Sequence, residues 1–137
     1  MVSPQETEII SKLVLAAFLG MLVGLERQMH RKPAGMREHG LVCMGSCLFA
    51  IVSLSFTQGD VSRVASGVVT GIGFLGAGTI LHLKDKVVGL TTAAELWVIA
   101  AIGLAVGIGL YTISTVTTLL VLLMLVSGRF LEKKVQK

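Results

Sequence analysis

The side chains that could do chemistry in this sequence gather at the ends of its apolar segments. Glu26 and Arg27 close the first segment, Arg37 and His39 open the second, and Glu95 lies near the start of the fourth. If these ends meet, Glu26 can form a charge-assisted hydrogen bond with Arg37. Arg27 can bind Glu95 in the same way. We interpret the set either as an interfacial ion network that fixes helix ends or as a docking or ligand-sensing surface.

A second candidate is the stretch GIGFLGAGTIL, in which Gly71, Gly73 and Gly76 form a G-x-G-x-x-G pattern. In dinucleotide-binding loops this spacing follows a strand and precedes an acidic residue by about 20 positions. Glu95 meets the acidic spacing, but the apolar context predicts no preceding strand. The sequence also contains no G-x-S-x-G, H-E-x-x-H or Walker pattern. We therefore expect no enzyme activity, no cofactor and no metal site.

Composition points to a lipid environment. Of the 137 residues, 53% are hydrophobic and 15% are charged, and the mean hydropathy is +0.84. A soluble domain this short cannot bury so much apolar surface. The net charge of +4 comes from short basic runs between apolar blocks, a pattern that does not indicate nucleic-acid binding.

The apolar blocks cover residues 9–25, 40–56, 61–83 and 93–126. A single helix over the last block would be about 50 Å long, against a hydrocarbon core of about 30 Å. This block must therefore turn back, and we place the turn at residues 107–112. The prediction is an all-α bundle of about five transmembrane helices in residues 1–128, followed by a short basic tail in residues 129–137.

The basic residues predict the orientation of these spans. Cytoplasmic loops of membrane proteins carry an excess of Lys and Arg. Ten basic residues fall on one side of the five-span arrangement: Arg27, Arg31, Lys32, Arg37, Lys84, Lys86, Arg129, Lys133, Lys134 and Lys137. We therefore expect the N-terminus to lie outside and the C-terminus to be cytoplasmic. The acidic start of the chain does not resemble a secretory signal peptide.

Three local signatures predict where helices begin. SPQE offers Ser3 as an N-cap with Glu6 closing a capping box. TTAAE offers Thr91 and Thr92 as the cap of the fourth span, with Glu95 in the acidic position.

At the third span, Asp60 can cap the helix and form a salt bridge with Arg63 on the opposite, outer side.

Within the second span, Cys43 and Cys47 share a helical face. Two such thiols could bind a soft metal such as Cu(I). Packing within the bundle is the simpler interpretation.

Glycines recur at helix-packing spacing. Small residues let transmembrane helices approach closely, which supplies packing that the hydrophobic effect does not. The G-x-x-x-G pairs and the glycine-rich third span comprise Gly20, Gly24, Gly67, Gly71, Gly73, Gly76, Gly78, Gly103 and Gly107. We interpret residues 71–78 as the centre of a tightly packed bundle. The alternative is a broken helix whose exposed carbonyls line a permeation path.

Four ordered motifs resemble the transmembrane domain of the MgtC/SapB family. These are GLERQ, PAGMREHGLV, DVSRVASGVVTGIGFLGAGTIL and GLTTAAELWVIAAIGLAVGIGLY, which together span residues 19–111. The resemblance implies a multi-pass bacterial inner-membrane protein associated with growth in low Mg²⁺ and survival inside host cells. It also implies that some members inhibit the F-type ATP synthase, and that the family does not transport Mg²⁺.

The resemblance carries functional positions onto this chain. They are Glu26 and Arg27, Arg37 and His39, Asp60 and Arg63, and Thr91 and Thr92. The chain departs from the family pattern at Glu38, where the family has Thr, and at Glu95, where a small or hydroxyl residue is common. Many members also continue into a soluble domain.

Three functional hypotheses follow. The first is a non-enzymatic protein that modulates another membrane complex, such as the ATP synthase, or ion homeostasis. The second is an oligomeric Mg²⁺ or proton channel or transporter lined by the glycine-rich third helix. The third is a homodimer formed through the face that carries Gly67 and Gly71. The expected partners are the lipid bilayer, a membrane protein and a second copy of the chain, and not nucleic acid.

Overall fold

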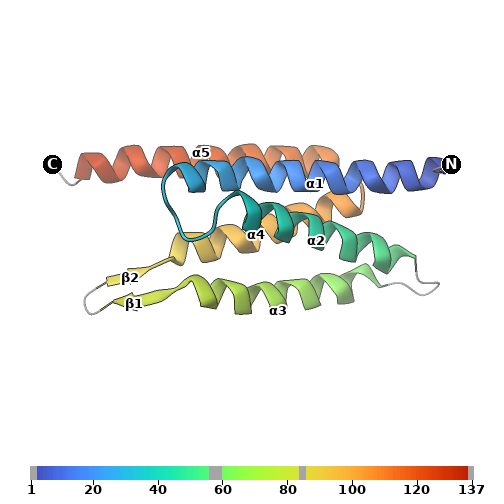
Figure 1. Ribbon diagram of the computed structural model, residues 1–137, viewed down its shortest axis with the longest axis horizontal. Helices are drawn as coiled ribbons and strands as arrows, with labels where there is room; N and C mark the ends of the chain where they lie inside the picture. Colours follow the sequence, from blue (N-terminus) through green and yellow to red (C-terminus); the bar gives the residue numbers. More distant parts are fainter. Residues whose placement is uncertain (1–2, 56–59, 84–85, 136–137) are drawn as a thin grey trace.

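The computed structural model describes residues 3–55, 60–83 and 86–135 and contains five helices and one short hairpin. The elements are α1 (Pro4–Met29), α2 (Met36–Leu54), α3 (Val61–Thr79), β1 (Leu81–Leu83), β2 (Lys86–Val88), α4 (Leu90–Gly107) and α5 (Tyr111–Val135). All five helices are long and apolar enough to cross a membrane. They run up and down side by side, with the two chain ends at opposite ends of the bundle (Figure 1).

The all-α, multi-pass architecture predicted from the sequence is therefore confirmed. The turn predicted at residues 107–112 is also present, because α4 ends at Gly107 and α5 begins at Tyr111. Gly109 takes the left-handed conformation there (φ 86°), and the amide of Leu110 donates to the carbonyl of Ala105. This is the glycine-capped helix ending that reverses a chain sharply. The helix α5 continues through the predicted tail boundary, as far as Val135.

The third segment ends earlier than its apolar pattern suggests. The helix stops at Thr79, and Leu81–Leu83 pairs antiparallel with Lys86–Val88. The hairpin returns the chain through Gly89, which has φ 93° and lies against the carbonyl of Thr79. A side chain at this position would be strained in conformation and would also collide with that carbonyl.

Helix α4 is the centre of the bundle, since it contacts all four other helices. The core lies where α1, α2 and α4 meet, and it includes Val23, Cys43, Cys47, Ile99 and Val106, all fully buried. Helix α5 packs on α4 and α1, while α3 packs mainly on α4 at the edge. The two cysteines are free thiols in this core.

Four glycines bring the backbones of the central helices together. A Cβ atom on Gly20 would lie 2.5 Å from the carbonyl oxygen of His39, and one on Gly107 would lie 2.6 Å from that of Cys47. Gly24 and Gly103 are equally close to α2, and Gly103 lies against the carbonyl of Cys43. The close packing predicted for these four glycines is confirmed.

Within this chain, the predicted close packing is absent for most of α3. A Cβ atom on Gly67, Gly71, Gly73 or Gly78 would meet nothing within 4 Å, and only Gly76 packs, 3.4 Å from Ala93. The reason is position, because α3 has one main neighbour and only 11% of its span is buried. The helix is also continuous from Val61 to Thr79, so the broken helix of the alternative interpretation is absent from this part of the chain.

Two of the predicted helix starts are correct. The hydroxyl of Ser3 accepts from the amide of Glu6 at 3.2 Å, and the Glu6 carboxylate accepts from the amide of Ser3 at 2.7 Å. Asp60 accepts from the amide of Ser62 at 2.9 Å. Its hydrogen bonds from Ser62 and the amide of Arg63 lower the pKa of Asp60. The cap is therefore complete at neutral pH and weakens as the pH falls through this lowered pKa.

The Asp60 and Arg63 side chains do not form the predicted salt bridge within the described residues, where the carboxylate binds backbone and hydroxyl groups instead. The fourth helix start is also a correction. The N-cap is Gly89, and Thr91 and Thr92 lie inside the first turn. The left-handed turn at Gly89 starts the helix three residues before Thr92. Glu95 therefore does not close a capping box, and its carboxylate contacts the Arg27 side chain.

We expect Gly103→Ala to destabilise the bundle, because the added methyl meets the Cys43 backbone, which cannot move without shifting α2. Overpacking of this kind costs about 1–3 kcal/mol. The matched control is Gly73→Ala, which adds the same methyl in open space on α3. Unfolding in detergent, followed by the fluorescence of the single tryptophan, measures the difference. Equal stability of the two variants would contradict the packing described here.

Candidate functional site

The polar cluster predicted from the sequence assembles at one end of the bundle. It lies where α1 ends, α2 begins and α4 completes its first turns, at the end that also holds the hairpin (Figure 1). The close contact of Gly24 with Gly35 draws the start of α2 against α1. Helix α2 then starts with a hydrogen bond from the Gly35 amide to the Glu38 carboxylate, at 2.8 Å.

An ion pair between Arg27 and Glu95 joins α1 to α4. The guanidinium Nε lies 2.9 Å from the carboxylate Oε2, and both side chains are 4% exposed. The Nε–H does not point along this line, so the contact is a close ion pair without an aligned hydrogen bond. Buried charges of this kind depend on each other, since removing one leaves the other unpaired in a medium that solvates it poorly.

His39 brings α2 into the cluster. Its ring is fully buried, and Nδ1 lies 2.8 Å from the carbonyl oxygen of Gly35. A carbonyl oxygen only accepts, so Nδ1 must carry the hydrogen. The other nitrogen, Nε2, lies 3.6 Å from Oε2 of Glu95. At this distance the two side chains lie close together without a hydrogen bond between them.

A second carboxylate lies beside Arg27. Glu26 lies 3.4 Å from Arg27 and 3.4 Å from His30, which is exposed. Two carboxylates, Glu26 and Glu95, thus lie beside the guanidinium of Arg27.

The structure confirms part of the predicted pairing. Arg27 and Glu95 bind each other as expected. Glu26 does not pair with Arg37, because its carboxylate lies beside Arg27 and His30, while Arg37 is exposed on the outer side of α2. The role of His30 was missed, although its position four residues after Glu26 places both on one helix face.

The remaining candidate residues lie elsewhere. Asp60 and Arg63 begin α3 at the opposite end of the bundle (Figure 1). Thr92 is buried beside the cluster in the first turn of α4, and Thr91 is exposed. Among the described residues, no group of three or more His, Cys, Asp or Glu side chains is arranged to hold a metal ion. The cluster can stabilise the helix ends that it joins.

We expect Glu95→Leu and Arg27→Leu each to destabilise the protein by about 3–5 kcal/mol, because each leaves one buried charge unpaired. The double variant should recover most of this loss, since an apolar pair needs no partner charge. Unfolding of all four proteins in detergent completes the cycle. If the double variant lost as much unfolding free energy as the two single variants together, the two side chains would not interact.

Comparison with known proteins identifies the family of this chain. The sequence matches the MgtC family over residues 13–134. It is 50% identical over 127 residues to "Putative magnesium transporter YhiD" of Escherichia coli strain K12, covering 84% of this chain and 59% of the relative.

It is also 41% identical over 138 residues to "Protein SrpB" of Synechococcus elongatus, covering 89% of this chain and 75% of the relative. It is 40% identical over 113 residues to "Protein MgtC" of Salmonella typhimurium strain 14028s, covering 82% of this chain and 49% of the relative. Several of these relatives are much longer, so the chain spans about half to three fifths of their length. No solved structure matches it. A five-helix membrane protein with these motifs and these relatives belongs to the MgtC family.

Proposed function

We propose that this chain is a non-enzymatic protein of the bacterial inner membrane that modulates another membrane complex, such as the F-type ATP synthase, or ion homeostasis, when Mg²⁺ is low. The observation that supports this best is the uncovered surface of the bundle. Only 11% of the α3 span and 11% of the α5 span are buried within the chain. Two of the five helices therefore present most of their surface to lipid or to a partner.

A link to Mg²⁺ is supported by the relatives, one of which bears the name of a putative magnesium transporter. The chemistry of the described residues favours regulation over transport. Mg²⁺ sites are usually built on carboxylates with retained waters. Here Glu26 and Glu95 lie at the bundle end and are engaged by basic side chains.

A set of exposed basic residues at the same end offers a second contact surface. We define the basic rim as Arg31, Lys32, Arg37 and Lys86, all of which are exposed. With the positive-inside rule, this rim supports a cytoplasmic position for this end and an outside position for the N-terminus. A rim of one charge sign attracts an acidic partner and steers its approach.

Modulation then requires that the chain bind one state of its partner more tightly than another. A ligand shifts an equilibrium only by its difference in affinity for the two states. The buried Arg27, His39 and Glu95 cluster keeps the rim-bearing helix ends in fixed relation. A rigid surface of this kind can discriminate between two shapes of a partner without chemistry of its own.

Capture of the partner tests the proposal. Tagged protein is purified from gently solubilised native membranes, and the captured proteins are quantified by mass spectrometry. We expect one membrane complex to be enriched, and Arg37→Ala to reduce its recovery severalfold because a rim charge is lost. Lys12→Gln removes one positive charge in the distant half of α1 and should leave recovery unchanged. Recovery of only lipid and chaperones would contradict the proposal.

The alternative function is an oligomeric Mg²⁺ or proton channel or transporter lined by α3. The printed name of the Escherichia coli relative favours it. It predicts that the purified protein in sealed liposomes moves Mg²⁺ or protons faster than empty controls. It also predicts that Gly73→Leu, which meets no neighbour within the chain, abolishes this flux without unfolding the bundle. Absence of flux in liposomes that contain folded protein would eliminate it.

A further inference from the structure

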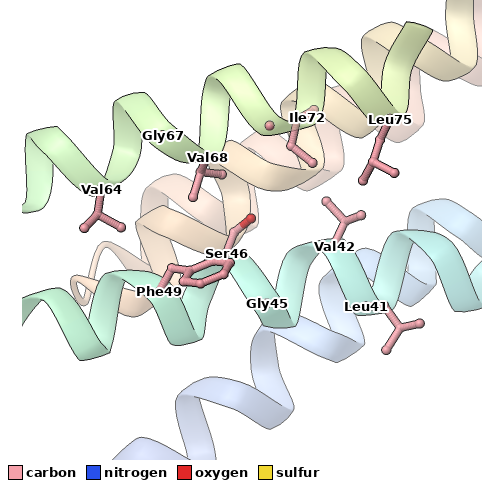
Figure 2. Close-up of a pocket in the computed structure, with 11 residues that line it drawn as sticks. Leu41, Val42, Gly45, Ser46, Phe49, Val64, Gly67, Val68, Ile72 and Leu75 are labelled. Carbon is pink, nitrogen blue, oxygen red and sulfur yellow. The ribbon is translucent and has the colours of Figure 1, made fainter. Parts of the chain in front are cut away.

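An apolar groove of about 680 Å³ lies between α2 and α3. Leu41, Phe49, Val64 and Leu75 line it, with α4 behind (Figure 2). Helices α2 and α3 both pack on α4 but make little contact with each other. The groove therefore opens sideways, toward the lipid, over the part of each helix that crosses the membrane.

Both walls of the groove contain glycine. Gly45 lies on the α2 wall, and Gly67 and Gly71 lie one turn apart on the α3 wall. A Cβ atom at any of the three would meet nothing within 4 Å. Glycines at this spacing let two helix backbones approach each other. The glycine pairs of this spacing on α1 and α4 lie against α2. No described helix of the chain covers Gly67 and Gly71.

A buried hydroxyl points into the groove. Ser46 is 4% exposed, and its side chain extends from α2 toward α3 (Figure 2). It forms no hydrogen bond with the described residues, whereas Ser114 and Thr118 on α5 each bond to a backbone carbonyl one turn earlier. A polar group surrounded by apolar side chains gains from a partner. An acyl chain cannot provide a hydrogen bond, but the side chains or backbone of another helix can.

The end of the same α3 face carries two opposite charges. Asp60, Arg63, Gly67 and Gly71 follow each other at intervals of three, four and four residues, which places them on one side of the helix. Asp60 and Arg63 are both exposed, and the Arg63 guanidinium forms no ion pair with the described residues. The face therefore begins with one positive and one negative group and continues with small residues.

We propose that this surface binds a second copy of the same chain, with α3 of each copy packed against α3 of the other across the mouth of the groove. Two copies insert in the same orientation, because that orientation is set by the charges of one sequence. A two-fold axis along the membrane normal then brings identical faces together. The two α3 helices are then parallel, and Arg63 of each copy lies about one turn from Asp60 of the other. The long Arg63 side chain can reach across one turn, so a single face is complementary to itself in charge.

This interface goes beyond the proposed function and does not depend on it. It uses the groove between α2 and α3, whereas the polar cluster and the basic rim lie at the end of the bundle, around the first turn of α2. Loss of the dimer would leave capture of another complex open to test, and failure of that capture would leave the dimer unaffected.

The test compares Gly71→Leu with Gly73→Leu. Both replace a glycine of α3 that has open surroundings, but residue 73 lies on the opposite side of the helix from residues 67 and 71. We expect native mass spectrometry from nanodiscs to show dimers for wild type and Gly73→Leu. Gly71→Leu should raise the dissociation constant of the dimer at least tenfold. The thermal unfolding temperature of the monomer should stay unchanged.

Crosslinking in native membranes gives an independent readout. Gly67→Cys should form a disulfide-linked dimer on mild oxidation, and Gly73→Cys should not. Wild type is the background, because its two thiols are fully buried.

Three results would overturn the proposal. Wild-type monomers with retained phospholipid would assign the groove to lipid. Dimers that survive Gly71→Leu would place the interface elsewhere, and wild type found only in complex with a different protein would assign the groove to that protein.

Discussion

Close approach of three helix backbones is the constraint on which the rest of this molecule depends. In a bilayer, apolar side chains gain little by leaving lipid for protein, so packing has to come from contact distance. Glycines at residues 20, 24, 103 and 107 allow α1 and α4 to press against α2. The buried core of the bundle lies where these three helices meet.

The polar cluster is a consequence of that approach. Arg27, His39 and Glu95 come from three different helices, and they meet only because the backbones beneath them are in contact. Their burial makes the charges of Arg27 and Glu95 interdependent. The cluster thus ties the helix ends together where the chain leaves the apolar region, and it fixes the position of the basic rim. This explains how strongly polar motifs can have a structural role in this protein.

Sequence reasoning was most successful where the signal was local or periodic. Apolar block length predicted five spans, and G-x-x-x-G spacing identified the contacts of α1 and α4. The same reasoning failed on α3. Glycine spacing shows that a helix can make close contacts, but it does not show whether a neighbouring helix is present in the chain. The cap at Thr91 and Thr92 failed for a related reason, since Gly89 and the hairpin before it set the helix start. The contact of Glu26 with His30 was available from their spacing of four residues. The direction of Arg37 away from Glu26 was not, because no linear pattern encodes it.

The most direct test of this account measures the Arg27 and Glu95 contact in a bilayer. Solid-state NMR on isotope-labelled protein in lipid can record the dipolar coupling between the Arg27 Nε and the Glu95 carboxyl carbon, together with the exchange of the attached hydrogen in heavy water. The account predicts a strong coupling, because Nε and Oε2 lie 2.9 Å apart, and slow exchange, because both side chains are buried. A missing coupling with rapid exchange would show that water separates α1 from α4, and the packed centre described here would be incorrect.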